Sequence, residues 1–344
     1  MSKNSIEING NSIPSVPRDP DFFINKTMVF YGTTNSGKSF LIDDIMYICS
    51  KKIPEFWVFC GSNTKMEDYK DKIPDVCLNT VIEKDFLKKF KERQDMKSKL
   101  FNYINKTSTL EEVLSYCPNQ TTFVRQKSML FNKLDEAGRK YPHKMKTKDI
   151  EKKKVQFMKK IIHMNRPYLE KLFKQRDQEE LLRVVKYLDL NPRAMLVMDD
   201  CASHIPALLR EDKSNSLTEL FFNGRHYNIT TAITTQDIKY VAPQIRKNAM
   251  LSFCTTKKTA NDCFTNESNS FTRDVRRKAQ NLIDHLFDMG NYEKLVYSEL
   301  YDKFYYFRAE EHPDLKVGAD YLWKLSSLKG SERVDNNFNS MFKV

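Results

Sequence analysis

Short runs of apolar residues recur along the chain and predict the buried strands of a central sheet. An amphipathic segment from about Lys38 to Ser50 lies between the first two runs. Two short buried strands joined by a helix predict a βαβ unit, and therefore an α/β fold with a mainly parallel sheet. The predicted strands are Met28–Tyr31, Phe56–Cys60, Ala194–Met198, Ile229–Thr234 and Ala249–Cys254.

Two other patterns add to this core. From about Glu83 to Leu188, apolar residues recur every three or four positions among many charges, which predicts a long, mostly helical insertion. Near the other end of the chain, Lys294–Tyr297 and Lys303–Arg308 alternate in polarity or are rich in aromatic residues, and a turn separates them. These two segments predict an antiparallel β-hairpin.

The segment between the first strand and its helix, GTTNSGKS, has the spacing of a P-loop. Gly32 and Gly37 let the backbone curl so that successive amides point inward, and the following helix adds its positive N-terminal end. Lys38 is expected to reach the β- and γ-phosphates of a nucleotide, and the Ser39 hydroxyl to contact Mg²⁺. A chance turn rich in Gly and Ser is disfavoured because all four fixed positions match. The predicted nucleotide-binding residues are Gly32, Thr33, Thr34, Asn35, Ser36, Gly37, Lys38 and Ser39.

Polar residues follow two of the later strands at their C-terminal tips. Asp199 and Asp200 end the run AMLVM, where Asp199 is expected to hold Mg²⁺ and Asp200 to polarise the attacking water. Gln236 follows the next strand, where ligands bind in open α/β sheets, and is expected to sense the γ-phosphate or position water. The alternative for Gln236 is a plain turn residue.

Arg225 precedes the strand Ile229–Thr234, so we expect it at the opposite end of the sheet from Lys38. This position disfavours a role at the phosphate site of its own subunit, but it fits an arginine finger that serves a neighbouring subunit in a ring. A surface arginine that caps the loop is the alternative, and the sequence leaves both open.

The formal net charge of +12 suggests a polyanionic partner, and nucleic acid fits better than a membrane because no basic amphipathic helix stands out. Residues 140–176 hold thirteen Lys or Arg and only three acids. This basic segment is interpreted either as a surface for DNA or a protein partner, or as a solvated helical face.

Seven cysteines without a CxxC pair, and six histidines without ligand spacing, argue against a zinc site and for a reduced, intracellular compartment. No apolar run is long enough to span a membrane, and the polar N-terminus is not that of a signal peptide, so we expect no membrane insertion.

The ordered motifs GTTNSGKS, AMLVMDD and NGRHYNITTAITTQD resemble those of the genome-packaging ATPases of nucleo-cytoplasmic large DNA viruses, the poxvirus-like branch of the FtsK–HerA superfamily. Packaging ATPases of virophages and polintons are similar. The resemblance covers about residues 20–62 and 188–310. It implies a P-loop NTPase of the ASCE/RecA-like class that works as a homo-oligomeric ring and packages double-stranded DNA into a capsid with ATP and Mg²⁺.

The resemblance also assigns roles to single residues. It implies Lys38 and Ser39 as phosphate and magnesium contacts, Asp199 as the magnesium acid, Asp200 as the activator of water, Gln236 as a sensor and Arg225 as a finger acting in trans. Many superfamily members carry Glu where this chain has Asp200, and the helical insertion matches no motif of the family. Capsid proteins are implied as further partners, and the host cytoplasm or the virion as the location.

The predicted domain organisation follows from these patterns. Residues 1–20 form a flexible arm, residues 21–325 form a P-loop ATPase domain interrupted by the basic helical insertion 83–188, and residues 326–344 form a disordered tail. Two other functions stay open: a nucleotide-gated DNA-binding or capsid-assembly module with little turnover, and a P-loop kinase. A kinase would need a lid with arginines and an acceptor pocket, and Asp199-Asp200 with Gln236 suits attack by water better.

Overall fold

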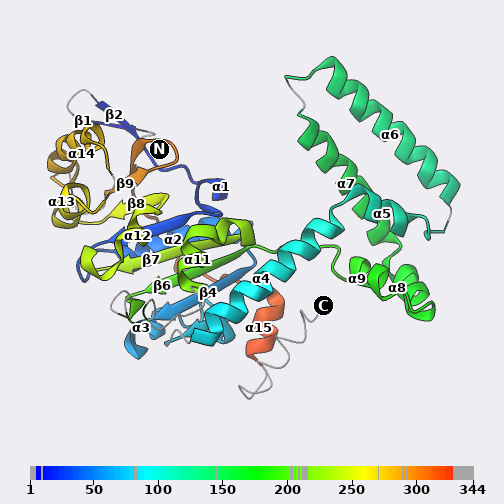
Figure 1. Ribbon diagram of the computed structural model, residues 1–344, viewed down its shortest axis with the longest axis horizontal. Coiled ribbons are helices and arrows are strands. Elements are labelled where there is room, and N and C mark those ends of the chain that lie inside the picture. The colour runs from blue at the N-terminus through cyan, green and yellow to red at the C-terminus, as the bar shows by residue number, and fades with distance from the viewer. Residues whose placement is uncertain are drawn as a thin grey trace. The chain divides into compact units, whose positions relative to one another are not determined.

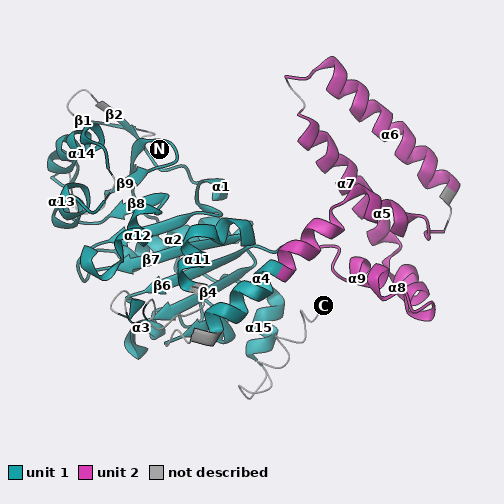
Figure 2. Cartoon of the chain, in the orientation of Figure 1, with its two compact units in different colours: residues 1–95, 192–344 teal, residues 96–191 magenta. Residues whose placement is uncertain are grey.

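The computed structural model of the chain describes residues 5–8, 11–80, 84–118, 120–143, 146–201, 204–205, 207, 210, 216–269, 271–288, 290 and 293–327. The chain divides into two compact units, residues 1–95 with 192–344 and residues 96–191 (Figure 2). We call the first the sheet unit and the second the helical unit.

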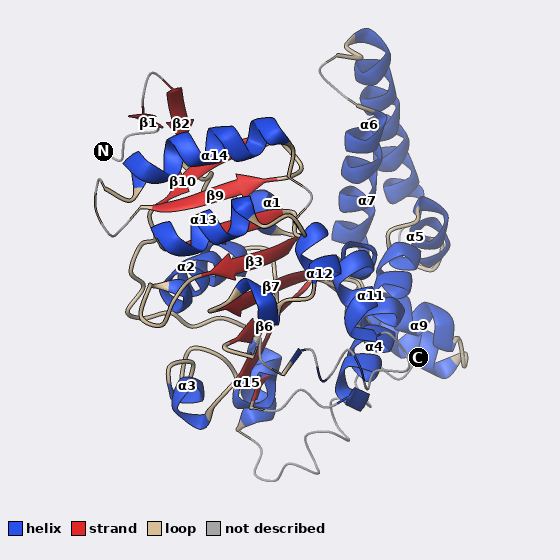
Figure 3. Cartoon of the chain, turned by 60° about the vertical axis from the view of Figure 1, so that its left-hand side comes forward, coloured by secondary structure: helices blue, strands red, loops and turns tan. Residues whose placement is uncertain are grey.

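An eight-stranded sheet forms the centre of the sheet unit, in the order β10-β9-β8-β3-β7-β6-β4-β5 (Figures 1 and 3). The strands from β8 to β5 are parallel, while β9 pairs antiparallel with both β8 and β10. The predicted α/β class, the mostly parallel sheet and the C-terminal hairpin are therefore confirmed. The strands are β3 (Thr27–Tyr31), β4 (Glu55–Cys60), β5 (Leu78–Asn79), β6 (Ala194–Asp199), β7 (Ile229–Thr235), β8 (Leu251–Cys254), β9 (Lys294–Ser298) and β10 (Lys303–Phe307).

Strand β7 lies between β3 and β6, and this placement brings the predicted motifs to one edge of the sheet. Tyr31 at the end of β3 pairs with Thr235 of β7, and Asp199 at the end of β6 pairs with Cys60 of β4. Because these strands are parallel, their C-terminal ends meet at the same edge, which is where ligands bind in open α/β sheets.

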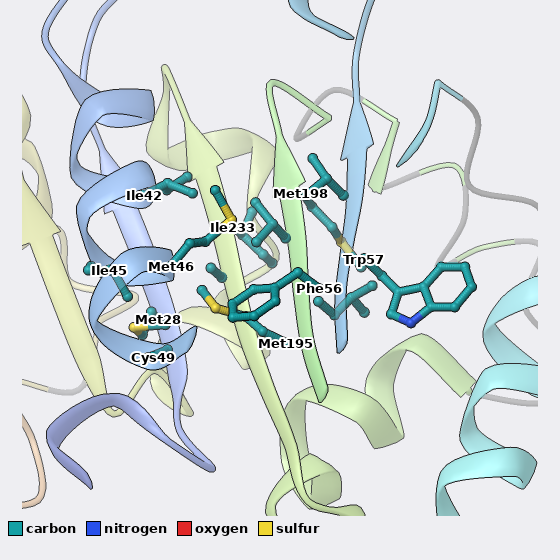
Figure 4. Close-up of a cluster of buried hydrophobic side chains, with 14 of the residues drawn as sticks. Met28, Ile42, Ile45, Met46, Cys49, Phe56, Trp57, Met195, Met198 and Ile233 are labelled. Atoms are coloured by element: carbon teal, nitrogen blue, oxygen red, sulfur yellow. The ribbon is translucent and has the colours of Figure 1, made fainter. Parts of the chain in front are cut away.

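Helix α2 (Lys38–Ser50) begins at the last residues of the P-loop and packs on one face of the sheet. Its residues Ile42, Ile45, Met46 and Cys49 follow the spacing i, i+3, i+4, i+7 and are fully buried, so one stripe of the helix faces the strands (Figure 4). Burial of each of the three Ile and Met side chains contributes about 1.5–3 kcal/mol to stability. This packing fixes the start of α2, and with it the P-loop, against the sheet.

The two faces of β3 belong to two different cores, as the period of two in a strand requires. Met28 and Phe30 pack in the core that contains α2, whereas Val29 and Tyr31 pack in a second core with α13 (Lys257–Thr265) and α14 (Arg273–Leu286). Helices therefore cover both faces of the strand that carries the P-loop.

The helical unit is built from the end of α4 (Lys84–Ile104) and five further helices, so the predicted helical insertion is confirmed. Its buried side chains, among them Leu110, Met158 and Phe173, form a core of their own that contains no residue of the sheet unit. The helices are α5 (Thr107–Leu114), α6 (Gln120–Lys140), α7 (Thr147–Met164), α8 (Arg166–Gln175) and α9 (Glu179–Lys186).

The ends of the chain differ in part from the prediction. Where a flexible arm was expected, β1 (Ser5–Ile8) and β2 (Asn11–Pro14) form an antiparallel hairpin, because Ile8 and Ile13 are buried against the core beside α13 and α14. Helix α15 (Asp320–Ser326) reaches the first residue of the predicted tail, and residues 328–344 of that tail lie outside the described residues.

Shorter elements complete the description. They are α1 (Pro20–Phe23), α3 (Asn63–Glu67), η1 (Asp75–Cys77), α11 (Ser216–Asn223), η2 (Gly224–Tyr227), η3 (Ile238–Tyr240) and α12 (Pro243–Lys247). Within the described ranges, none of the helices combines the length and the apolar character needed to cross a membrane.

Candidate nucleotide-binding site

The P-loop runs from the end of β3 into α2, and its glycines are required by geometry. Gly37 has a φ of +87°, a conformation that glycine adopts without strain. A Cβ on Gly32 would lie 1.9 Å from Thr255 Oγ1, so the close approach of the chain just beyond β8 leaves room only for glycine. Gly37 is the N-cap residue of α2 and supplies no side-chain cap, and such a helix N-terminus favours the binding of an anion.

Lys38 is buried at the start of α2 and folds back onto its own loop. Its Nζ donates hydrogen bonds to the carbonyl oxygens of Gly32 and Thr33, each at 2.7 Å. Burial lowers the pKa of Lys38 from its ordinary value, although the negative charges of Asp199 and Asp200 act in the opposite direction. The ammonium group is therefore held within the P-loop.

Asp199 is 1% exposed, and three hydroxyl groups donate hydrogen bonds to its carboxylate. Ser39 Oγ and Tyr69 Oη donate to Oδ2 at 2.9 and 2.8 Å, and Thr234 Oγ1 donates to Oδ1 at 2.8 Å. Burial, and next the charge of Asp199, raise the pKa of Tyr69 well above its ordinary value, so the phenol stays a donor. Three hydrogen bonds to one buried carboxylate fix its orientation.

Asp200 follows Asp199 and is exposed. Its backbone adopts the left-handed conformation, with a φ of +58°. Its backbone N–H donates to Thr234 Oγ1 at 2.8 Å, and its Oδ1 accepts a hydrogen bond of 2.8 Å from Gln236 Nε2. Gln236 Oε1 in turn accepts one of 3.3 Å from Thr34 Oγ1 of the P-loop. The structure thus brings three predicted residues, Asp199, Asp200 and Gln236, together with the P-loop.

The sequence of the chain is similar to those of known proteins. The zonular occludens toxin (Zot) family matches residues 132–280. The uncharacterized protein B354L of African swine fever virus is 25% identical over 97% of this chain and 98% of its own length. The uncharacterized protein L437 of Acanthamoeba polyphaga mimivirus is 36% identical over a shorter stretch, 18% of this chain and 20% of its own length.

Solved structures are similar as well. The genome packaging NTPase B204 of Sulfolobus turreted icosahedral virus 2, in complex with ATP-gammaS, matches with a TM-score of 0.39 and 12% identity, over 83% of this chain and 98% of B204. The pCW3 conjugation coupling protein TcpA matches with a TM-score of 0.43 and 15% identity, over 94% of this chain and 70% of TcpA.

The chain has the strand, P-loop and helix arrangement of P-loop NTPases at the edge of a mostly parallel sheet. Its motifs resemble those of the viral genome-packaging type, and an uncharacterized viral protein matches it along nearly its whole length.

Three residues to which the sequence assigned no role contribute to the candidate site: Tyr69, Thr234 and Lys65. Lys65 Nζ pairs with Asp68 Oδ2 at 2.8 Å and lies 3.7 Å from Asp199 Oδ2. Burial by itself would lower the pKa of Lys65, but the hydrogen bond to Asp68 and the charges of Asp199 and Asp200 outweigh it and raise the pKa. Tyr69 and Lys65 lie outside the motifs, and Thr234 lies within the third motif without a predicted role, so only the fold places the three beside Asp199.

Two cavities flank the P-loop among the described residues. The first has a volume of about 530 Å³, and the second has a volume of about 680 Å³. Both volumes lie in the range of small-molecule sites. The first is lined by Thr34–Phe40, Ser62, Thr64, Lys65, Asp68, Asp199, Asp200 and Gln236, and we call it the acidic cavity. The second is lined by Thr33–Gly37, Phe40, Leu41, Thr255, Thr256, Lys257, Phe287, Asp288, Lys294 and Ala309, and we call it the aromatic cavity.

Arg225 is the one predicted site residue that the structure does not bring to this edge. It is exposed on η2, just before β7 begins. Since β3 and β7 are parallel, with Tyr31 opposite Thr235 at their far ends, Arg225 lies at the end of the sheet away from the P-loop. Its action on a neighbouring subunit stays a prediction.

Proposed function

We propose that this NTPase is an ATP-driven double-stranded DNA translocase that packages a viral genome into a capsid. The observation that carries the proposal is the meeting of Lys38, Asp199, Asp200 and Gln236 around one cavity at one edge of the sheet, where hydrogen bonds join Asp200, Gln236 and the P-loop. The resemblance of the motifs to viral packaging ATPases supplies the link from nucleotide chemistry to DNA.

In this proposal the P-loop amides and Lys38 bind the β- and γ-phosphates. The ammonium group exchanges the carbonyl oxygens of Gly32 and Thr33 for phosphate oxygens, which bind a cation more strongly. The apolar lining of the aromatic cavity, with Phe40 and Phe287, suits the base of the nucleotide. The acidic cavity then receives the terminal phosphate.

The residues at the acidic cavity fit Mg²⁺ as the cofactor. Ser39 and Asp199 offer a hydroxyl and a carboxylate oxygen 2.9 Å apart. Mg²⁺ prefers oxygen ligands, and protein sites for it commonly use one or two carboxylates together with phosphate oxygens and water. Bound there, Mg²⁺ would neutralise charge on the phosphates.

Asp200 and Gln236 carry the hydrolytic step. Water attacks the γ-phosphorus, the bond to the bridging oxygen breaks, and ADP and phosphate result. Asp200 accepts the hydrogen bond of the attacking water, and Gln236 holds the Asp200 carboxylate toward the cavity through its 2.8 Å hydrogen bond. Arg225 is proposed to complete the charge stabilisation in the site of a neighbouring subunit, in a homo-oligomeric ring.

The basic stretch of the helical unit is proposed to contact DNA without sequence preference, because charges that pair with phosphates carry no base information. Its residues 140–176 hold thirteen Lys or Arg against three acids. Capsid proteins are the further partners that a packaging motor requires.

The test is the steady-state release of phosphate from ATP, with and without long double-stranded DNA, for the wild type and for Asp200→Asn. We expect hydrolysis that DNA stimulates and that the substitution reduces at least about a hundredfold, since a general base contributes that much. Phosphate that appears on an acceptor nucleotide would indicate a kinase. ATP binding without hydrolysis in the wild type would refute the translocase and support a nucleotide-gated module, which the shorter Asp200 favours.

A further inference from the structure

Lys65 is a second cation in the acidic cavity, contributed by a segment that carries no nucleotide motif. It lies on α3, directly after the C-terminal end of β4, and its side chain is 26% exposed. It lines the same cavity as Lys38, Asp199, Asp200 and Gln236. The cavity therefore holds one lysine on the P-loop side and another on the β4 side.

The backbone position of Lys65 is fixed by its surroundings. Ser62 caps α3 by accepting a hydrogen bond from the backbone N–H of Lys65, and Tyr69 ties the chain beyond α3 to Asp199. The Lys65 ammonium group, 3.7 Å from Asp199 Oδ2, is thus directed to the carboxylate that faces the phosphate-binding edge.

The other partner of Lys65 is an acid that it can exchange. Asp68 is 56% exposed, and an ion pair to an exposed acid contributes only about 0.2–1 kcal/mol. A terminal phosphate in the cavity offers several charged oxygens to a flexible lysine chain, so it competes well with Asp68.

We propose that Lys65 is a phosphate-binding residue that contacts the terminal phosphate of a bound nucleoside triphosphate from the side opposite Lys38. The proposal rests on the proposed nucleotide site, and it adds the segment after β4 to that site. It makes Lys65 a residue that distinguishes a nucleoside triphosphate from a diphosphate.

The experiment is a comparison of the dissociation constants of ATP and ADP, measured by titration calorimetry on the full chain. For Lys65→Met we expect a loss of ATP affinity of about ten- to a hundredfold, because a hydrogen bond to a charged group is removed. ADP affinity should stay within about twofold, since ADP lacks the phosphate concerned. Lys65→Arg, which keeps the charge, should retain part of the ATP affinity.

Lys70→Met is the matched control, because Lys70 lies five residues away, is exposed and pairs only with Glu67 among the described contacts. It should leave both affinities unchanged.

Asp68→Asn separates phosphate binding from a role in holding α3. If Lys65 binds phosphate, this variant keeps or raises the ATP affinity, because a competing acid is gone. If Lys65 only anchors α3, Asp68→Asn loses ATP affinity as Lys65→Met does, and the proposal is overturned.

An equal loss for ATP and ADP, or no loss for either, in Lys65→Met would also overturn it. Failure of the wild type to bind ATP would be a different result, because it would refute the proposed nucleotide site as a whole.

Discussion

The nucleotide site and the helical unit use charge in different ways. At the site, hydrogen bonds join the charged groups into one network. Thr234 Oγ1 links Asp199 to the backbone of Asp200, and Gln236 links Asp200 to the P-loop. In the helical unit, ion pairs join charged side chains two or three at a time, as where Lys154 of α7 pairs with Asp135 of α6 at 2.9 Å and with Glu151 of its own helix at 3.2 Å. We therefore expect the effect of a substitution to depend on the contacts of the single residue at the site, and on the number of charges removed in the helical unit.

The largest effect is expected at the P-loop. Lys38→Ala removes the only cation that touches the loop carbonyls among the described hydrogen bonds, and with it the main charge opposite the phosphates. We expect ATP hydrolysis to fall at least about a hundredfold, the usual loss when a preorganised donor is removed. Steady-state phosphate release measures it. Lys51→Ala, at the exposed C-terminal end of the same helix, is the control. Near-normal turnover in Lys38→Ala would show that the site is wrongly assigned.

Thr234 offers the next test, because two partners depend on its hydroxyl group. Thr234→Val keeps the shape of the side chain but leaves Asp199 Oδ1 and the Asp200 N–H each short of a hydrogen bond. The free energy of unfolding should fall by about 1–3 kcal/mol, the cost of a buried polar group without a partner. Thermal unfolding and phosphate release should both detect the change.

The same strand supplies the control for Thr234. Thr231 Oγ1 is buried and has no hydrogen-bond partner among the described residues, so Thr231→Val removes a polar atom that contributes nothing. This substitution should leave the melting temperature unchanged or raise it. If both variants lose the same stability, the interlocking of Asp199 and Asp200 through Thr234 is not what holds the site.

Thr234 also illustrates which contacts of the site can be predicted from the sequence and which cannot. P-loop residues are adjacent in the chain, and residues at the tips of parallel strands must share an edge, so Lys38, Asp199 and Gln236 could be predicted to meet. Tyr69 and Thr234 could not, because their contacts with Asp199 depend on how a loop folds and on which way one threonine points.

The N-terminal hairpin was missed for a related reason. Its short strands are rich in Asn and Ser, which favour turns, and only the burial of Ile8 and Ile13 against another part of the chain makes them strands. The role of Arg225 can be predicted from the sequence but not tested in a single chain, because its proposed partner belongs to another subunit.

In the helical unit, we expect an effect that grows with the number of charges removed. Exchanging the exposed residues Lys148, Lys152, Lys153 and Lys160 for Gln should weaken binding to long duplex DNA about ten- to a hundredfold at moderate salt. The slope of log K against log salt should decrease by about 0.9 for each DNA phosphate that the variant no longer neutralises. Any one of the four substitutions alone should change the affinity only slightly.

A matched set of four exposed lysines in the sheet unit serves as the control: Lys51, Lys70, Lys88 and Lys89. It changes the net charge by the same amount and should leave the salt slope nearly intact. If both sets weaken DNA binding equally, the basic stretch has no special role and is a solvated face.

The smallest effect is expected at Phe40. It tests whether a substitution at the site lowers nucleotide affinity strongly because the residue is hydrogen-bonded there, or only because the residue lies near the P-loop. Phe40 lies in the P-loop region and lines both cavities, but it is 43% exposed and makes apolar contacts rather than hydrogen bonds among the described interactions. We expect Phe40→Ala to raise the dissociation constants of ATP and ADP alike, by about three- to tenfold, because it removes apolar area next to the base. Phe222→Ala, similarly exposed on α11, should change neither. If Phe40→Ala instead lowered nucleotide affinity about a hundredfold, proximity to the P-loop would be enough to make a residue critical. The hydrogen bonds at the site would then not explain the difference between the two regions.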